Sequence, residues 1–327
     1  MGIGVLEPDR YDPRMSVAVA SHSFPKHPVL RRELTARYPD AQFNETRQPL
    51  RGDDLIRFLR GHDKAITGLE VIDARVFDAV PELRVVSKYG VGLDMIDLAA
   101  ARGRGVSVRW TPGVNRQSVA ELTIAFMIAL SRRLVPLAAD LQQGRWGAGG
   151  GRQLSSATVG VIGCGHVGKT VARLCGAFGA TVLAHDVVDY ADFYRAHDVR
   201  AVDFGELLRA ADIVTVHVPL DGSTRHLIDA RALALMKPTA FLINTARGGI
   251  VDEEALTAAL AGGRLGGAAA DVFAVEPPVN LELLRLPTFI GTPHVGGSTE
   301  EAVLAMGRAA ISGLDLEHGS RDLTSNS

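Results

Sequence analysis

TVGVIGCGHVGKT, residues 158–170, joins a short apolar segment to a G-x-G-x-x-G loop made by Gly163, Gly165 and Gly168. This order predicts a strand, a tight turn and a helix whose N-terminal N–H groups face an anion. Gly163 permits the turn, Gly165 lets the backbone approach a pyrophosphate, and Gly168 lets the helix pack on the strand. A glycine loop alone is common in α/β proteins, so the neighbouring residues decide the interpretation.

The acid that follows the next strand supports a dinucleotide site. The segment 181–185 predicts a strand, and Asp186 follows it, 18 residues after Gly168. An acid at this spacing binds the ribose hydroxyls of a dinucleotide, and it repels the 2′-phosphate of NADP. No Arg or Lys follows until Arg195. The motif therefore predicts NAD as the cofactor, the alternative being an acid that merely ends a strand.

Length and composition predict a globular protein with two domains. The chain has 327 residues, 46% hydrophobic and 22% charged, with a net charge of −2. Without a basic excess, we expect no nucleic-acid partner. The longest strongly apolar stretch, residues 124–130, is much shorter than the roughly 20 residues that span a bilayer, so we expect no membrane association.

The N-terminus and the cysteines favour a cytoplasmic protein. The first residues include acids and lack the basic-then-apolar pattern of a secretion signal. Cys164 and Cys175 are the two cysteines, too few for a disulfide scaffold. Neither has metal-ligand spacing to a Cys or His, and we expect both to be small buried side chains.

Strand-like and helix-like segments alternate along the chain, which indicates parallel sheets. The predicted strands are 16–21, 64–67, 83–88, 181–185, 211–220, 241–249, 268–273 and 289–294. The predicted helices include 29–38, 53–60, 73–80 and an apolar helix over 118–134, and 143–153 is predicted to be a loop. Ligands of such sheets bind at the carboxyl ends of strands.

Three residues near predicted strand ends carry suitable chemistry. Arg247 precedes two glycines, and its guanidinium fork suits a carboxylate that also carries a keto oxygen. His294 can exchange a proton near neutral pH. Glu276 could accept a hydrogen bond from its imidazole and raise its pKa. Taken singly, each has an alternative, because surface arginines, satisfied histidines and solvated loop acids are common.

Other chemistries lack their motifs. The ten histidines form no H-x-x-x-H or Cys/His cluster, so we expect no metal site. No G-x-S-x-G elbow is present, so we expect no Ser-His-Asp hydrolysis, and we expect no hydrolysis of a nucleoside triphosphate at the glycine loop. The loop after residue 88 contains Gly90 and Gly92, whose backbone could hold a small anion or could form a plain turn.

Several stretches resemble the D-isomer-specific 2-hydroxyacid dehydrogenases. In the family's order they are KYGVGLDMID (88–97), TPGVNRQSVAELTIAFMIAL (111–130), the glycine motif (160–168), VHVPLDGSTRHL (216–227), LINTARGGIVDEEAL (242–256), ADVFAVEP (270–277) and TPHVGGST (292–299). They cover most of residues 62–310, and the stretch containing Arg247 is highly specific. Loop 146–154 (WGAGGGRQL) departs from the family pattern, and His166 replaces a common Arg beside the pyrophosphate, which weakens or re-tunes cofactor affinity.

The resemblance implies an α/β fold of two Rossmann-like domains with a cleft between them. A discontinuous, flavodoxin-like substrate domain spans residues 1–111 plus 296–327, and an inserted NAD-binding Rossmann domain spans 112–295. Family members are usually dimers joined through the NAD-binding domain, so a homodimer is implied.

The resemblance also assigns the site residues. Arg247, Glu276 and His294 are the implied catalytic residues. The implied substrate loop consists of Tyr89, Gly90, Val91 and Gly92, whose backbone holds the substrate carboxylate together with Arg247. The implied cofactor residues are Gly163, Gly165, His166, Val167, Gly168, Asp186, His217, Val218, Pro219, Thr224, Thr245, Ala246, Asp271 and Gly296.

The implied reaction is hydride transfer between NAD and C2 of a small D-2-hydroxy or 2-keto acid. KYGVGLD and TPGVN resemble phosphoglycerate-dehydrogenase-like members, and since the chain ends at Ser327 we expect no regulatory domain and no serine feedback. Glyoxylate or hydroxypyruvate reductase is an alternative, because the pocket loops near 21–26 and Tyr89 vary. An alternative of another class is an NAD(H)-sensing corepressor, because such relatives retain the same three residues. Phosphite oxidation, which uses the same three residues, is a minor alternative. Formate dehydrogenases are excluded because they carry Gln where Glu276 stands.

Overall fold

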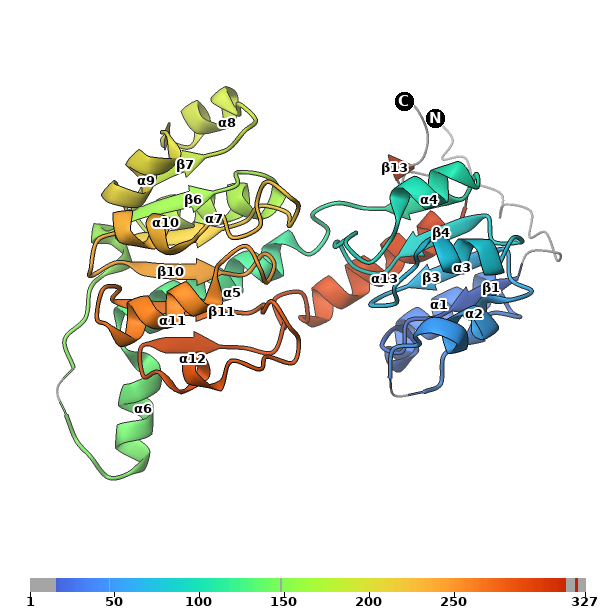
Figure 1. Ribbon diagram of the computed structural model, residues 1–327, viewed down its shortest axis with the longest axis horizontal. Coiled ribbons are helices and arrows are strands. Elements are labelled where there is room, and N and C mark those ends of the chain that lie inside the picture. The colour runs from blue at the N-terminus through green and yellow to red at the C-terminus, as the bar shows by residue number, and fades with distance from the viewer. Residues whose placement is uncertain (1–15, 47, 148, 316–320, 323–327) are drawn as a thin grey trace, which may run out of the picture. The chain divides into compact units, whose positions relative to one another are not determined.

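The computed structural model describes residues 16–46, 48–147, 149–315 and 321–322. The chain divides into two compact units (Figure 1). Unit 1 takes the described residues up to Asn115 and those from Glu300 onward, and unit 2 is Arg116–Thr299. Each boundary falls where a helix begins, a few residues beyond the implied boundaries at 111/112 and 295/296.

Unit 1 is built on a six-stranded sheet with the order β13-β5-β4-β3-β1-β2, parallel except for β13. Its strands are β1 (Val17–Val19), β2 (Gln42–Phe43), β3 (Lys64–Thr67), β4 (Val85–Lys88), β5 (Ser107–Trp110) and β13 (Arg321–Asp322). Its helices are η1 (Phe24–Lys26), α1 (Pro28–Arg37), α2 (Gly52–Leu59), α3 (Ala74–Ala79), α4 (Leu98–Gly103) and α13 (Glu300–Gly313).

Helices cover both faces of this sheet and form a separate core on each. Successive residues of a strand point to opposite faces, so they belong to different cores. Val17 and Val19 belong to a core shared with α1 and α13. Ala18, between them, belongs to a second core shared with α2, α3 and α4. β1 therefore reads as a continuous apolar run, VAV, as expected of a strand buried on both faces.

Unit 2 is a seven-stranded, fully parallel sheet with the order β12-β11-β10-β9-β6-β7-β8. The strand order reverses between β6 and β9, so the ligand position of this fold lies beyond their carboxyl ends. Its strands are β6 (Thr158–Ile162), β7 (Thr181–His185), β8 (Val199–Ala201), β9 (Ile213–Val216), β10 (Phe241–Asn244), β11 (Gly267–Ala270) and β12 (Phe289–Gly291).

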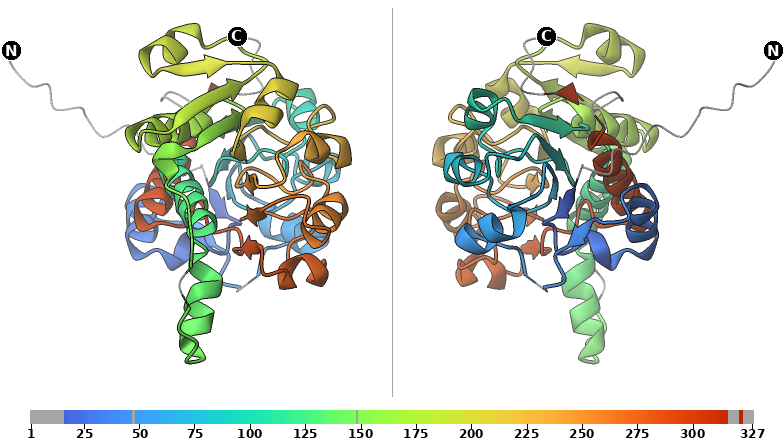
Figure 2. Two further views of the ribbon diagram at one scale, coloured as in Figure 1. Left: turned by 90° about the vertical axis from the view of Figure 1, so that its left-hand side faces the viewer. Right: turned by 90° about the vertical axis from the view of Figure 1, so that its right-hand side faces the viewer.

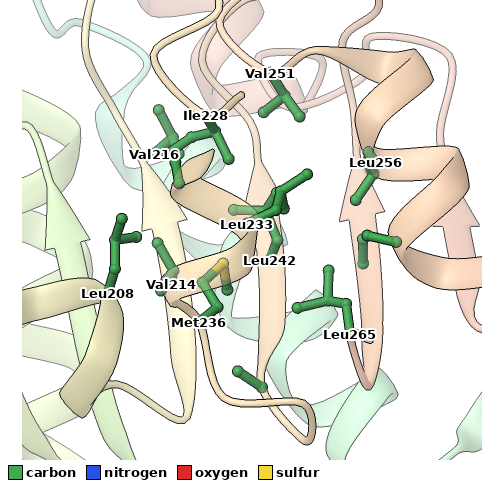
Figure 3. Packing of buried hydrophobic residues seen from close by; sticks show 14 of the residues in the cluster. Leu208, Val214, Val216, Ile228, Leu233, Met236, Leu242, Val251, Leu256 and Leu265 are labelled. Carbon is green, nitrogen blue, oxygen red and sulfur yellow. The ribbon is translucent and has the colours of Figure 1, made fainter. Parts of the chain in front are cut away.

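The helices of unit 2 form two cores, one on each face of the sheet. On one face α5 and α7 pack on β6 and β7. On the other, α9, α10 and α11 cover β9, β10 and β11, where Leu208, Leu233 and Leu256 meet the strand residues (Figure 3). The helices are α5 (Arg116–Ser131), α6 (Leu134–Gln142), η2 (Leu154–Ser156), α7 (His166–Ala177), α8 (Ala191–Ala196), α9 (Phe204–Ala210), α10 (Ala230–Leu235), α11 (Glu253–Ala261) and α12 (Leu281–Arg285).

The predicted single helix over 118–134 is wrong at its C-terminal end. α5 ends at Ser131, Arg133 adopts a left-handed φ of 52°, and α6 starts anew at Leu134. The buried face of α5 is as expected, with Glu121 exposed. Among the residues that the structure describes, no single helix qualifies as a membrane span, and only α5 and α6 together, bent by 64°, pass by length and composition.

Four predicted strands run too far, and the difference matters for the site. β9, β10, β11 and β12 end at Val216, Asn244, Ala270 and Gly291, three residues or more before the ends predicted from the apolar pattern. Residues that follow these strands remain apolar because the loops still pack against the core, as Val272 and Phe273 do. Other elements were not predicted at all: β2, β5, β8, β13, α4, α6 and α8 to α12.

Candidate active site

His294 and Glu276 form an ion pair beyond the carboxyl ends of β11 and β12. His294 Nδ1 lies 2.8 Å from Glu276 Oε2, and a carboxylate can only accept, so Nδ1 carries the proton. Glu276 Oε1 accepts a second hydrogen bond, from the Phe273 N–H, at 3.0 Å. The His294 side chain is 44% exposed. Its Nε2 is therefore the atom left to exchange a proton with a ligand.

The pair raises the proton affinity of the imidazole. The hydrogen bond to Glu276 raises the pKa of His294 above its ordinary value, although burial and the charge of Arg247 oppose the shift. Burial disfavours the charged form of Glu276, but the hydrogen bonds from His294 and Phe273 outweigh it and lower the pKa of that carboxyl. At neutral pH the geometry therefore favours an imidazolium beside a carboxylate.

Asp271 holds the turn that carries His294. Asp271 is 1% exposed, and its carboxylate accepts from Thr292 Oγ1 at 2.5 Å, Val295 N at 2.8 Å and Gly296 N at 2.7 Å. Its carbonyl accepts from His294 N at 2.8 Å. These bonds fix His294 in a left-handed conformation with φ 54°, which few non-glycine residues adopt. Contact of Asp271 and Gly296 with the cofactor stays a prediction.

Arg247 lies three residues beyond β10, in a loop fixed by Asn244. Asn244 Nδ2 donates to the Arg247 carbonyl at 2.8 Å, and Asn244 Oδ1 accepts from Ala246 N at 3.1 Å. The guanidinium donates to the Ala246 carbonyl at 2.7 Å, and its charge acts on both Glu276 and His294. Arg247, Glu276 and His294 therefore come together at one edge of the sheet of unit 2.

The glycine loop fits the phosphates of a dinucleotide. Gly163 has φ +88°, and a Cβ there would lie 2.7 Å from the carbonyl carbon of His217. A Cβ at Gly168 would lie 2.0 Å from the carbonyl oxygen of Gly163, which explains these two glycines by packing. A Cβ at Gly165 would meet nothing within 4 Å. Packing within the protein therefore leaves Gly165 unexplained, and close approach of a pyrophosphate at this glycine stays a prediction.

The residues around this loop also fit. Asp186 accepts from Cys164 N at 2.5 Å and from Val188 N at 2.8 Å, so its carboxylate is held against the loop. His217 Nε2 lies 2.9 Å from Thr215 Oγ1, and burial lowers the pKa of His217 to about 3, so the ring is neutral. Its buried Nδ1 has no partner within the described residues, which leaves one polar atom for a ligand to satisfy.

The remaining predicted cofactor residues lie in the loops after β9 and β10 and in the first turn of α7. Thr224 Oγ1 donates to the Pro219 carbonyl at 2.6 Å and closes a turn over residues 219–224, directly after Val218. The hydroxyl of Thr123 donates its one proton to Val119 O at 2.8 Å. In the 2.8 Å hydrogen bond between Thr123 and Thr245, the hydroxyl of Thr245 is therefore the donor. The Thr245 hydroxyl is thus turned toward α5. His166 and Val167 begin α7, so their N–H groups lie at the positive end of the helix dipole.

Sequence reasoning missed three contributors. Asn244 and Thr292 fix the Arg247 and His294 loops, and their signal was a polar residue directly after an apolar run. Lys169 gives no signal in the residues that follow Asp186, because it precedes that acid in the chain, on α7. Its Nζ lies 3.4 Å from the centroid of the Tyr190 ring, four residues beyond Asp186. Both cysteines are buried as predicted, and burial raises their pKa to about 11 for Cys164 and about 12 for Cys175.

The predicted substrate loop belongs to unit 1 and follows β4. Tyr89 N donates to the Thr67 carbonyl at 2.8 Å, and Gly90 turns the chain with φ +126°. Tyr89, Gly90, Val91 and Gly92 are all half-buried. This loop lies at the carboxyl edge of the parallel strands of its sheet, where ligands of this fold class bind. Its contact with a substrate stays a prediction.

Known proteins are similar to this chain in sequence and in fold. Residues 124–296 match the D-isomer specific 2-hydroxyacid dehydrogenase, NAD binding domain. The chain is 42% identical to a D-3-phosphoglycerate dehydrogenase of Methanocaldococcus jannaschii over 71% of its length, but spans only 45% of that relative. It is 35% identical to a hydroxypyruvate reductase of Thermotoga maritima, over 84% of this chain and 90% of that one.

A solved structure supports the same assignment. The D-lactate dehydrogenase of Aquifex aeolicus, complexed with NAD and lactic acid, is 26% identical and superposes with a TM-score of 0.80, covering 90% of this chain and 93% of that one. By motif, sequence and fold together, the chain belongs to the D-isomer specific 2-hydroxyacid dehydrogenase family.

Proposed function

We propose that the protein is an NAD-dependent D-2-hydroxyacid dehydrogenase that acts on a small substrate, in the manner of phosphoglycerate dehydrogenase. The observation that carries the proposal is the 2.8 Å contact between His294 Nδ1 and Glu276, within reach of the Arg247 charge. The glycine loop and Asp186 support NAD as the cofactor. Bound NADH supplies the hydride that C2 of a 2-keto acid accepts.

The protein's residues supply charge and a proton. Arg247 binds the substrate carboxylate through its planar fork and polarises the keto oxygen. As C2 receives the hydride, its oxygen becomes an alkoxide, and His294 Nε2–H gives it a proton. The imidazole is left neutral and regains its proton from solvent. Glu276 stabilises the imidazolium form before the transfer and keeps Nε2 directed at the substrate.

The substrate is testable by NADH oxidation with purified protein. The panel is phosphohydroxypyruvate, hydroxypyruvate, glyoxylate, pyruvate and a branched 2-keto acid. The proposal expects the highest kcat/KM with phosphohydroxypyruvate. A preference for hydroxypyruvate or glyoxylate would instead assign a reductase of the same family, and no turnover with intact NADH binding would overturn the dehydrogenase proposal.

Replacing Glu276 by Gln should move the pH profile. Because Glu276 raises the pKa of His294, its loss should lower that pKa. Reduction needs the protonated imidazole, so its rate should fall at a lower pH in Glu276→Gln than in the wild type. The measurement is kcat for keto-acid reduction across pH 5 to 10. Glu282→Gln, at an exposed acid of α12, is the control, and coincident profiles for all three proteins would contradict the role.

Asp186→Ala should relax the cofactor preference. The substitution removes the carboxylate expected to bind the ribose and to repel a 2′-phosphate. Loss of charge-assisted hydrogen bonds should raise the KM for NADH about 10-fold or more. The ratio of kcat/KM for NADH to that for NADPH should fall with it. Asp189→Ala, at a nearby exposed acid, is the control, and an unchanged ratio in Asp186→Ala would count against the assignment.

We also propose a homodimer joined through unit 2. α6 has no buried residue, and Leu134, Val135 and Leu141 are 49%, 51% and 58% exposed. Figure 2 shows this helix extending away from the sheet of its unit. Apolar side chains exposed together mark a contact surface. Light scattering should give a molar mass of twice the 34.8 kDa of one chain. In Leu141→Asp, the measured mass should fall toward that of one chain.

A further inference from the structure

A tryptophan side chain holds the substrate loop of unit 1. Trp110, the last residue of β5, donates its indole Nε1–H to the carbonyl oxygen of Val91 at 2.9 Å. The side chain comes from the strand next to β4, from which the loop emerges. Neither the motif nor the composition pointed to this contact.

The contact fixes the direction of one backbone N–H group. The carbonyl of Val91 and the N–H of Gly92 belong to the same planar trans peptide, and they point in opposite directions. With the carbonyl bound by the indole, the Gly92 N–H must point away from Trp110. A separate hydrogen bond, 2.8 Å from Tyr89 N to Thr67 O, fixes the start of the loop. The indole hydrogen bond is therefore a second contact that fixes the loop, at the peptide beyond the turn at Gly90.

The orientation of this peptide has a large electrostatic consequence. A peptide presents a positive end at its N–H and a negative end at its carbonyl oxygen. If the Val91–Gly92 peptide turned over, its carbonyl oxygen would face the place where its N–H had been. A carboxylate bound at the N–H would then meet a negative dipole end instead. Donation to the carbonyl also polarises the peptide, which makes its N–H a better donor.

We propose that Trp110 is a positioning residue for the substrate carboxylate. It keeps the Val91 carbonyl turned away, so that the Gly92 N–H is presented to the anion before substrate arrives. The inference rests on the proposed function, in which the substrate is a 2-keto acid and this loop binds its carboxylate. The indole itself touches neither substrate nor cofactor in this role.

Trp110→Phe tests the proposal, because it keeps an aromatic ring and removes the donor. Loss of one hydrogen bond corresponds to a rise of about 3- to 10-fold in the KM for the 2-keto acid. The carboxylate is bound equally before and during hydride transfer, so kcat and the affinity for NADH should stay near wild type. Trp110→His keeps a ring N–H, so its KM for the 2-keto acid should lie between those of the wild type and Trp110→Phe. Trp146→Phe is the matched control, since that side chain is 91% exposed.

A second measurement does not depend on turnover. Trp110 and Trp146 are the two tryptophans, so ¹⁵N-labelled protein gives two indole N–H signals. Oxamate, an unreactive analogue of a 2-keto acid, is titrated into the NADH-loaded protein. We expect the signal that is missing in Trp110→Phe to shift, and the Trp146 signal to stay in place.

The outcomes separate this inference from the proposed function. A wild-type KM in Trp110→Phe, or a Trp110 signal that ignores saturating oxamate, would overturn the positioning role. A Trp110 signal that shifts in a protein without turnover on any 2-keto acid would support the loop assignment and overturn the proposed reaction. If Trp110→Phe fails to fold, the indole signal of the wild type and the KM of Trp110→His decide the question.

Discussion

His294→Gln should lower kcat for 2-keto-acid reduction by at least ~100-fold, the usual contribution of a general acid. Glutamine can still hydrogen-bond to Glu276, but it cannot deliver a proton to an alkoxide. The affinity for NADH should stay near wild type, because His294 contributes a proton rather than a cofactor contact in the proposed reaction. The measurements are kcat at saturating NADH and the binding of NADH by fluorescence.

The control for this variant is another histidine with the same backbone. His226 also has a left-handed φ, 52° against 54° for His294, and its side chain is exposed in the same unit. His226→Gln therefore carries the same backbone strain without removing an acid. Wild-type kcat in His226→Gln with a large loss in His294→Gln would assign the effect to proton transfer. Near-normal turnover in His294→Gln would contradict the mechanism.

Gly248→Ala should destabilise unit 2 and the active site together. A Cβ at Gly248 would lie 1.9 Å from the backbone carbonyl carbon and oxygen of Phe273, and 2.4 Å from Ala274 N. Backbone atoms cannot move aside as a flexible side chain does, so the loop after β11 must shift. We expect the free energy of unfolding to fall by about 3 kcal/mol or more, at or above the top of the usual range for overpacking.

The same shift should reduce activity beyond the loss of folded protein. The Phe273 N–H donates to Glu276 Oε1 at 3.0 Å, so moving Phe273 displaces the carboxylate that orients His294. The measurements are denaturant unfolding, and kcat per folded molecule at a temperature where the variant is folded. Gly176→Ala, in α7, is the control, because a Cβ there meets nothing within 4 Å and Ala favours a helix. Equal stability of Gly248→Ala and wild type would contradict the packing argument.

The parts of the site that the sequence predicted best are those whose geometry is local. The glycine loop and Asp186 were found by spacing because one strand, one turn and one helix determine their positions. The ion pair of Glu276 with His294 joins residues from two loops, and residue chemistry alone left each residue with a common alternative. The resemblance to a family identified the pair, and the 2.8 Å contact places the two side chains together.

What the sequence could not predict depends on contacts between loops. The partners of Asp271 follow it by 21 to 25 residues, so its role in holding the His294 turn is visible only in the fold. The indole of Trp110 reaches Val91 across neighbouring strands, 19 residues apart. Apolar runs gave strands that were too long, because Val272 and Phe273 are buried in a loop. The break between α5 and α6 depends on one left-handed residue, Arg133.

Label transfer tests the central claim most directly. The protein is given the best 2-keto acid of the panel and NADH deuterated at both C4 positions, and the product is examined by mass spectrometry, NMR and chiral chromatography. The account predicts one deuterium per molecule, at C2 of a D-2-hydroxy acid, and none released to water. An L-product, an unlabelled product or deuterium in the solvent would contradict direct hydride transfer at this site.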